Sequence, residues 1–230
     1  MKPFERIGKA LSPDGTVLQL VRRDDEYVIL AGGQHLMSSR MHGSEESLAA
    51  LGCRQAGALS QPAVLIGGLG MGFTLRAALK RLPAAATVVV AELVAEVVEW
   101  NRGALGPLAG HPLDDPRVRV EIGDVTATLR SGSSSGEGRF DAVLLDVDNG
   151  PGAFTDSGNA ALYGETGIAA ALASLRPDGV LAVWSAREDR KFEQRLRNAG
   201  FSVQLERVRG HAGKSAHHTI YLAQRSQPQP

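Results

Sequence analysis

The sequence has a single cysteine, no net charge and no long apolar run. Cys53 is that cysteine among 230 residues, which excludes an intramolecular disulfide and a cysteine-based zinc site and fits a reducing compartment. Lys plus Arg number 25 and Asp plus Glu number 25. The chain therefore lacks the basic excess of proteins that bind nucleic acid through phosphate attraction, and we expect no nucleic-acid partner.

No segment approaches the ~20 consecutive apolar residues that cross a bilayer. The N-terminal stretch MKPFERIGKALSPDG mixes charged with apolar residues and has no continuous apolar core of a secretory signal. We expect a cytoplasmic protein that makes no membrane contact. Apolar residues still make up 43% of the chain, which is enough to bury a sizeable core.

The sequence pattern divides the chain into three parts. Residues 1–60 contain two short β-prone runs, 16–21 and 27–30, each preceded by turn residues, and then a connecting helix. We expect a small β-rich element there. Residues 61–225 form the main domain, which we interpret below as a nucleotide-binding transferase domain. Residues 226–230 are polar and proline-containing, and are expected to form a flexible tail.

Apolar strands alternate with helices from residue 63 onward. The expected strands are 63–66, 87–91, 118–122, 140–145 and 180–184. Continuous apolar strands of this kind are typical of a parallel sheet covered on both faces. Residues 202–208 and 218–223 then predict an antiparallel pair at one edge. The predicted fold is α/β: a Rossmann-like, doubly wound, mostly parallel sheet with an antiparallel C-terminal edge pair and a small N-terminal β element.

Ligands of an open parallel sheet bind outside the carboxyl ends of its strands, so the residues after each strand are the site candidates. The first strand is followed by Gly67, Gly68, Gly70 and Gly72. Glycines there let the backbone approach a ligand closely and turn into the next helix. A tight turn without a ligand is the alternative interpretation.

Acidic residues follow the second and third strands. Glu92 ends the second strand, where a carboxylate can accept both hydroxyls of a ribose, or can stabilise the start of the next helix. Asp124 and Val125 follow the third strand. Asp124 can accept a hydrogen bond from an adenine amino group, or can cap the next helix. We favour a nucleoside site built from these residues and the glycines.

The fourth strand is followed by Asp146, Asp148 and Asn149. Alternation along an extended segment puts Asp146 and Asp148 on one side, where two carboxylates can hold a cationic substrate or accept a proton. An Asx turn leading into the loop is the alternative. Asp146 is the first candidate for the catalytic proton acceptor, and Asp148 is the second.

Taken together, these sites resemble the class I S-adenosylmethionine-dependent transferase fold and, more narrowly, the spermidine synthase (polyamine aminopropyltransferase) family. The segment LDDPRV at 113–118, followed by Gly123 and Asp124, is similar to the family's DPRV…DG segment. Ala91 and Glu92 resemble its ribose-binding pair. The run LLD at 144–146 resembles the strand tip whose Asp is the proposed proton acceptor. The resemblance covers roughly residues 62–185.

This resemblance implies a transferase whose co-substrate is S-adenosylmethionine or its decarboxylated form. The enzyme would pass an aminopropyl or methyl group to a small amine acceptor, without a metal. The glycine loop, Glu92, Asp124, Val125 and Asp146 would hold the co-substrate. His42, Glu45 and Asn149 would bind the acceptor. The resemblance also implies a homodimer.

Departures from the family pattern bear on the substrate. The family's loop GGGDG carries an Asp that holds the amine of the aminopropyl tail, whereas residues 67–71 read GGLGM. Asn149 stands where the family has its second strand-tip Asp, and His42 and nearby acids stand for its Tyr-His-Glu motif. A loop without a carboxylate tolerates a methionine tail better. A methyltransferase that uses intact S-adenosylmethionine is therefore an alternative, and a non-catalytic nucleoside-binding protein is a second one.

Overall fold

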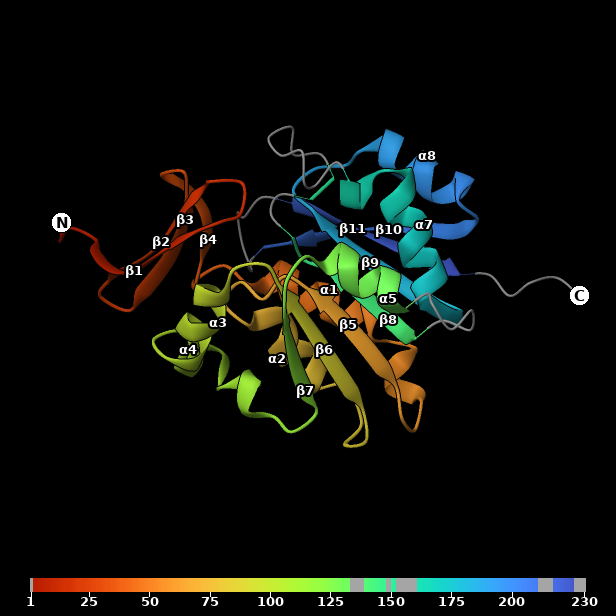
Figure 1. Ribbon diagram of the computed structural model, residues 1–230, viewed down its shortest axis with the longest axis horizontal. Helices are drawn as coiled ribbons and strands as arrows, with labels where there is room; N and C mark the ends of the chain where they lie inside the picture. Colours follow the sequence, from red (N-terminus) through yellow and green to blue (C-terminus); the bar gives the residue numbers. More distant parts are fainter. Residues whose placement is uncertain (1, 133–138, 148–149, 152–160, 211–216, 226–230) are drawn as a thin grey trace, which may run out of the picture.

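Two β-sheets organise the part of the chain that the computed structural model describes, which comprises residues 2–132, 139–147, 150–151, 161–210 and 217–225 (Figure 1). A four-stranded sheet lies at the N-terminus, and a seven-stranded sheet follows it. Figure 1 shows the N-terminal sheet at one end of the molecule, beside helices α3 and α4.

The N-terminal sheet is an antiparallel meander in the order β1-β2-β3-β4. Its strands are β1 (Glu5–Leu11), β2 (Val17–Arg23), β3 (Glu26–Ala31) and β4 (Gln34–Ser38). The predicted runs 16–21 and 27–30 correspond to β2 and β3. The sequence did not predict β1 and β4, because these edge strands bury few side chains and therefore lack an apolar pattern.

The large sheet has the strand order β10-β11-β9-β8-β5-β6-β7. Its strands are β5 (Ala63–Gly67), β6 (Thr87–Glu92), β7 (Val118–Ile122), β8 (Phe140–Leu145), β9 (Leu175–Ser185), β10 (Phe201–Arg209) and β11 (His217–Arg225). β5 pairs in parallel with β6 and β8, as do β6 with β7 and β8 with β9. β11 pairs antiparallel with both β9 and β10. This topology confirms the predicted fold class.

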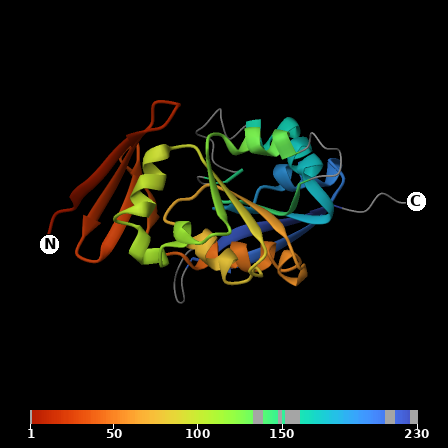
Figure 2. The same cartoon turned by 60° about the horizontal axis from the view of Figure 1, so that its bottom comes forward.

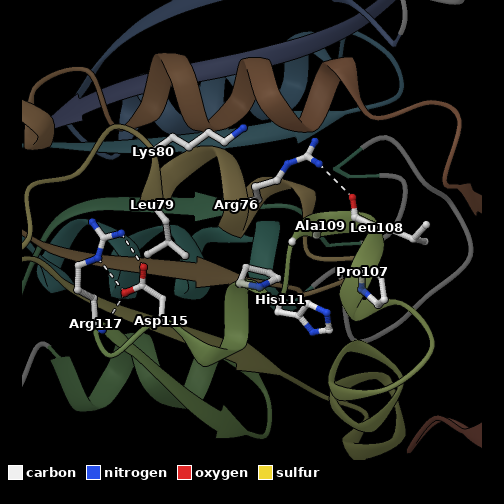
Figure 3. A pocket seen from close by; sticks show the side chains of 11 residues that line it. Arg76, Leu79, Lys80, Pro107, Leu108, Ala109, His111, Asp115 and Arg117 are labelled. Atoms are coloured by element: carbon white, nitrogen blue, oxygen red, sulfur yellow. Dashed lines mark hydrogen bonds and ion pairs between the residues drawn. The ribbon is translucent and has the colours of Figure 1, made fainter.

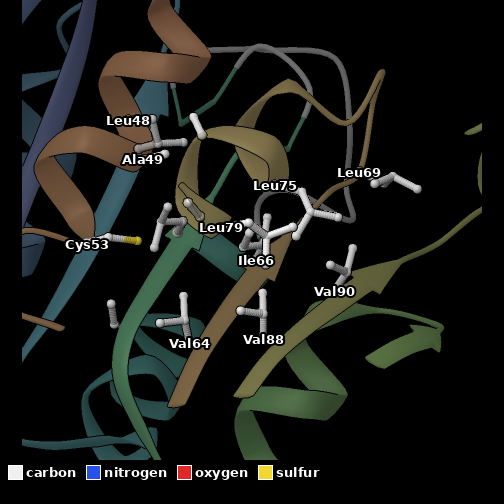
Figure 4. Close-up of a cluster of buried hydrophobic side chains, with 14 of the residues drawn as sticks. Leu48, Ala49, Cys53, Val64, Ile66, Leu69, Leu75, Leu79, Val88 and Val90 are labelled. Carbon is white, nitrogen blue, oxygen red and sulfur yellow. The ribbon is translucent and has the colours of Figure 1, made fainter. Parts of the chain in front are cut away.

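Helices cover both faces of this sheet (Figure 2). One face carries α1 (Gly43–Gly52), α2 (Phe73–Leu79) and α3 (Ala95–Arg102), and the other carries α5 (Val125–Gly132), α7 (Glu165–Ser174) and α8 (Arg190–Asn198). Strand residues alternate between the faces: Val64 and Ile66 pack under α1 and α2 (Figure 4). Leu65 belongs instead to the buried cluster of the other face, which includes residues of α5. Both faces are thus buried, which explains the continuous apolar strands.

Short helical turns complete the connections: η1 (Ala56–Ala58), α4 (Gly106–Ala109) and η2 (Pro112–Asp114). They account for one difference from the sequence analysis. The sequence predicts one connecting helix from Ser44 through Ala58, whereas α1 ends at Gly52 and the separate turn η1 follows. The chain must turn there to enter β5 at Ala63.

A second difference lies at Pro177-Asp178-Gly179, whose turn-forming residues predict a turn just before the expected strand 180–184. These residues lie within β9, where Phe140 pairs with Leu175 but Ala142 already pairs with Val180. The extra residues bulge out of the ladder, and Asp178 has φ +63°.

The N-terminal sheet packs beside the glycine-rich loop. Leu20 and Ile29 share a buried apolar cluster with Met71 and Phe73, at the start of α2. From β4, Met37 reaches the same loop. The sheet therefore forms a wall next to the carboxyl end of β5.

A substitution at Gly52 tests how closely α1 packs on the large sheet. An added Cβ would come within 2.9 Å of Ala182 Cβ and 3.1 Å of Leu144 Cγ. Replacing Gly by Ala in a helix normally stabilises it by ~0.5–1 kcal/mol. Here we expect Gly52→Ala to lower the unfolding free energy by about 1–3 kcal/mol, because of overpacking. Urea denaturation measures this, and a gain in stability would contradict the close packing. Ala50→Gly on the same helix is the control for helix propensity.

Candidate active site

The strand order reverses between β5 and β8, and a crevice at the carboxyl ends of such strands is where ligands bind in open α/β sheets. Backbone hydrogen bonds tie these strand ends together. Gly68 N–H donates to Ala91 O (2.9 Å), and Asp146 N–H donates to Gly67 O (2.9 Å). The ends of β5, β6 and β8 therefore form one connected edge.

Glycine at two positions allows this close approach. A Cβ on Gly67 would lie 2.8 Å from Val125 Cγ2, where α5 packs on the sheet. Gly68 has φ +88°, and a Cβ there would collide with the backbone carbonyl oxygen of Asp146. The loop can lie against the end of β8 only because both residues lack a side chain.

The rest of the loop faces the N-terminal sheet and α3. A Cβ on Gly70 would lie 3.1 Å from Met37 Sδ, and one on Gly72 would lie 3.0 Å from Asn101 Oδ1. Gly72 precedes α2 with φ +79°. Gly70 stands where the family pattern has its Asp, and the thioether of Met37 from β4 lies next to it.

Glu92 is 8% exposed and is bonded to the loop. Its Oε2 accepts from Leu69 N–H and its Oε1 accepts from Val94 N–H, both at 2.9 Å. The carboxylate thus holds both the glycine loop and the segment between β6 and α3. A carboxylate oxygen can accept more than one hydrogen bond, so these bonds do not by themselves exclude a ligand hydroxyl.

Asp124 is exposed and Val125 is buried. Asp124 Oδ1 accepts from Thr126 N–H at 2.8 Å, which is the capping interaction weighed in the sequence analysis. Val125 belongs to the core beneath α5. Asp124 therefore combines a structural hydrogen bond with an accessible carboxylate, and its role toward adenine stays a prediction.

Two exposed apolar side chains lie at the same edge and were missed by the sequence analysis. Leu93 is 47% exposed directly after β6, and Ile122 is 55% exposed at the end of β7. Ile122 pairs in register with Glu92. The sequence did carry a signal for them: each is a large apolar residue at the carboxyl end of a predicted strand, where ligands bind. They offer apolar surface beside Glu92 and Asp124.

A pair of carboxyl groups lies on the other side of the loop. Asp146 Oδ2 accepts from Thr74 Oγ1 at 2.6 Å, so α2 holds the end of β8. Glu45 of α1 is 7% exposed, and its Oε2 accepts from Ser44 Oγ at 2.6 Å. The sequence analysis had assigned these two acids to separate roles, whereas in the structure the charge of Asp146 acts on Glu45.

Burial raises the pKa of both acids. The pKa of Glu45 rises to about 7, first through burial and then through repulsion from Asp146. Burial raises the pKa of Asp146 to about 6, against the lowering effect of the Thr74 hydroxyl. Repulsion acts on whichever acid ionises second, so the two titrate as a pair. With its pKa raised to about 7, Glu45 is partly protonated near neutral pH.

His42 precedes α1 but has partners other than this pair. Its ring stacks on Phe73 with centroids 4.3 Å apart, and its Nδ1 lies 3.2 Å from Glu46 Oε1. Glu46 also accepts from Arg76 Nη2 at 2.6 Å. These contacts place His42 in the junction of α1 and α2. An acceptor-binding role for it stays a prediction.

Asp148 and Asn149 lie outside the described residues, so their assigned roles also stay predictions. The described neighbours show where the chain leaves β8. Gly150 N–H donates to Val147 O at 3.2 Å, and Tyr163 OH donates to the same carbonyl at 3.4 Å.

A cavity of about 640 Å³ lies elsewhere, between α2 and the segment from α4 to Arg117 (Figure 3). Its ionic groups are mostly paired. Arg117 Nη2 contacts Asp115 Oδ2 at 2.7 Å, and Arg76 Nη1 donates to Leu108 O at 3.1 Å, whereas Lys80 is exposed on the rim. Figure 3 shows these side chains on α2, on α4 and on the segment that follows α4.

The described residues contain no group of three or more His, Cys, Asp or Glu side chains that could hold a metal ion. They also contain no helix long and apolar enough to cross a membrane.

The buried pair makes stability depend on pH with a definite sign. The folded pKa of Glu45, about 7, exceeds the ~4.3 of an unfolded glutamic acid, so the folded state binds more protons between these values. The unfolding free energy therefore falls as pH rises through this window. Glutamine stays neutral at every pH, so Glu45→Gln avoids this loss. We expect the unfolding free energy of the variant minus that of the parent to be about 1–3 kcal/mol larger at pH 8 than at pH 5.

Denaturant unfolding at the two pH values measures this difference, with exposed Glu99→Gln as the matched control. An equal effect of Glu45→Gln at both pH values would show that Glu45 is ionised throughout.

Comparison with known proteins points to one family. No family model matches the chain. A polyamine aminopropyltransferase of Corynebacterium efficiens is 33% identical over 165 residues, which are 72% of this chain and 30% of that protein. The chain thus spans less than a third of the length of this relative.

Solved structures extend the likeness to nearly the whole chain. Spermidine synthase from Thermotoga maritima superposes with a TM-score of 0.74 at 21% identity, covering 96% of this chain and 73% of that one. A spermidine synthase in complex with the transition-state analogue AdoDATO gives 0.72 at 20% identity, covering 96% and 72%. The chain therefore has the fold of the spermidine synthases, and we describe it as a spermidine synthase-like protein.

Proposed function

We propose that the chain is a transferase that moves the aminopropyl group of decarboxylated S-adenosylmethionine to a small amine acceptor. The observation that carries the proposal is a carboxyl pair at the switch point of the sheet: Glu45, which is buried, and Asp146, which is half-buried and lies against the glycine loop. A partly protonated acid pair in a crevice suits a cationic substrate that must lose a proton.

The nucleoside half of the co-substrate would bind on the β6 and β7 side of the loop. Glu92 would accept from the ribose hydroxyls, and Asp124 from the adenine amino group. Leu93 and Ile122 would contact the adenine ring, because both present exposed apolar surface there. The complex of a structural neighbour with AdoDATO, named as a transition-state analogue, supports a substrate site in this fold.

The acceptor half would use the acid pair. A free amine is mostly protonated at pH 7 and must be neutral to attack. The ionised pair would bind the ammonium ion, and Asp146 would take its proton as the new carbon–nitrogen bond forms. The carbon–sulfur bond breaks in the same step, and the sulfur leaves with its electron pair as a neutral thioether. The sulfonium carbon is already electrophilic, so the chain's contribution is to position the amine in line and to hold its proton.

One observation favours the second candidate, a methyltransferase that uses intact S-adenosylmethionine. Gly70 stands where the family pattern has an acid, and Met37 Sδ approaches it. A thioether offers no charge to an aminopropyl ammonium group, and it does not repel the carboxylate of a methionine tail.

Replacing the proton acceptor tests the main proposal. We expect Asp146→Asn to lower kcat by about 10²–10⁴-fold, because the amide cannot take a proton from the amine. Release of 5′-methylthioadenosine from decarboxylated S-adenosylmethionine, with putrescine and other amines as acceptors, measures this. Exposed Asp25→Asn is the matched control. Undiminished activity in Asp146→Asn would exclude Asp146 as the base. Co-substrate binding without any turnover in the parent would favour a non-catalytic nucleoside-binding protein.

Calorimetric titration with the two sulfonium nucleosides decides between the candidates. An aminopropyltransferase should bind the decarboxylated form at least tenfold more tightly, or ~1.4 kcal/mol. The reverse preference would favour the methyltransferase. Absence of binding by both would remove the roles proposed for Glu92 and Asp124.

A further inference from the structure

A tryptophan on β9 lies next to the acid that follows β8. Leu145 of β8 pairs in register with Val183 of β9. The residues that follow them, Asp146 and Trp184, therefore lie side by side. Trp184 packs against the buried cluster on the face that carries α1 and α2, where Asp146 meets Thr74 of α2. Because adjacent strands are ~4.8 Å apart, Asp146 and Trp184 are direct neighbours on one face of the sheet.

His218 of β11 lies on the other side of this tryptophan. Trp184 pairs with Ile220, and His218 precedes Ile220 by two residues on the same face of β11. The centroids of the Trp184 and His218 rings are 4.9 Å apart, with an interplanar angle of 32°. Burial, and then the charge of His217, lower the pKa of His218 below its ordinary value of 6.5, so the ring is uncharged at pH 7.5. These two rings form a neutral aromatic patch beside Asp146.

The second acid, Glu45, comes from the opposite side of Trp184. Its helix α1 begins at the end of β10, where Gly43 N–H donates to Gly210 O at 2.7 Å. From there α1 crosses β11 and β9 and ends over β9 and β8. The charge of Asp146 acts on Glu45 across this interval. The elements that carry the two acids thus flank β9, and a cation shared by both carboxylates lies beside Trp184.

An indole ring at this place adds to the recognition of an ammonium ion. The face of a tryptophan ring attracts a cation within ~6 Å of its centroid, and the attraction grows where water is excluded. Trp184 and His218 are both half-buried. Trp184 Nε1 and His218 Nδ1 are buried and have no hydrogen-bond partner among the described residues. Packing therefore positions the two rings, and what they offer next to the acid pair is aromatic surface.

We propose that the aromatic patch selects the acceptor: Trp184 contacts the ammonium group that Glu45 and Asp146 hold, and the patch packs against an apolar or aromatic substituent of the same molecule. The acceptor is then a monoamine with such a substituent, instead of a diamine. This inference rests on the proposed function, since it takes the amine to bind at the acid pair.

Desolvation distinguishes this acceptor from a diamine. The second ammonium group of a diamine would lie on the neutral aromatic patch, and Trp184 and His218 offer it no carboxylate. Taking an ammonium ion out of water without a carboxylate partner costs more free energy than a cation–π contact returns. An alkyl or aryl substituent has no such cost, and an aryl ring also gains from stacking on the indole.

Calorimetric titration of the full chain at pH 7.5 with 2-phenylethylamine, butylamine and putrescine tests the selectivity. We expect 2-phenylethylamine to bind tenfold or more tightly than putrescine. Butylamine has the carbon chain of putrescine but one ammonium group, and it should also bind more tightly than putrescine. Trp184→Leu, which removes the ring but stays apolar, should weaken 2-phenylethylamine tenfold or more. Trp184→Phe keeps a ring and should restore most of that affinity, while both variants bind decarboxylated S-adenosylmethionine as the parent does.

Fluorescence reports contact with Trp184 without changing that residue. The chain has two tryptophans, Trp100 and Trp184. Trp100 lies against the N-terminal sheet, where a Cβ on Gly8 would lie 2.5 Å from Trp100 Nε1. Trp100→Phe therefore leaves Trp184 as the sole tryptophan and is also the matched control. We expect this variant to bind 2-phenylethylamine as the parent does, with a change in the emission of Trp184 that saturates at the calorimetric affinity.

Three results would overturn the inference: putrescine binding as tightly as 2-phenylethylamine, unchanged amine affinity in Trp184→Leu, or unchanged Trp184 emission at saturating amine. The emission test stands even where Trp184→Leu does not fold. Failure of the proposed function looks different, because it shows as absent binding of decarboxylated S-adenosylmethionine or as turnover that is insensitive to Asp146→Asn. Transfer to putrescine that is unchanged in Trp184→Leu would leave the proposed function standing and remove this inference alone.

Discussion

The candidate site depends on the close approach of the glycine loop to the end of β8. Asp146 N–H bonds to Gly67 O, and no side chain fits between Gly68 and the Asp146 carbonyl. This contact fixes where the chain leaves β8 and brings the Asp146 carboxyl to Thr74 of α2. A side chain at Gly67 or Gly68 would push the strand ends apart and move the Asp146 carboxyl away from the glycine loop.

Burial of acidic groups next to this contact has an energetic cost that the fold tolerates. Glu45 and Asp146 both have raised pKa values because they are desolvated, and Glu45 is further affected by the neighbouring charge. Natural proteins accept such destabilised groups where they have a use. A bound ammonium ion would relieve the same repulsion, which links the stability effect expected for Glu45→Gln to the binding role proposed for the pair.

The chain shares its scaffold with the spermidine synthases, and its glycine loop departs from the pattern of that family. The two sheets superpose over 96% of the chain. The loop, by contrast, lacks an acid and meets Met37. Substrate choice in this chain is therefore a question about a few side chains on a shared fold. Homodimer formation, cytoplasmic location and the roles of Asp148 and Asn149 stay predictions.

The sequence by itself determined the parallel sheet, because buried parallel strands are continuous apolar runs. It also determined which residues lie at the ligand-binding edge, because the residues that follow parallel strands share one edge of the sheet. It could not show β1 and β4, whose exposed side chains carry no pattern. Only the tertiary structure paired Glu45 with Asp146, since 101 positions separate them in the chain and α1 must dock on β8 and β9 before they meet. The same holds for the bonds of Glu92 to the loop and for His218 beside Trp184, which arise from strand order and helix packing rather than from local sequence.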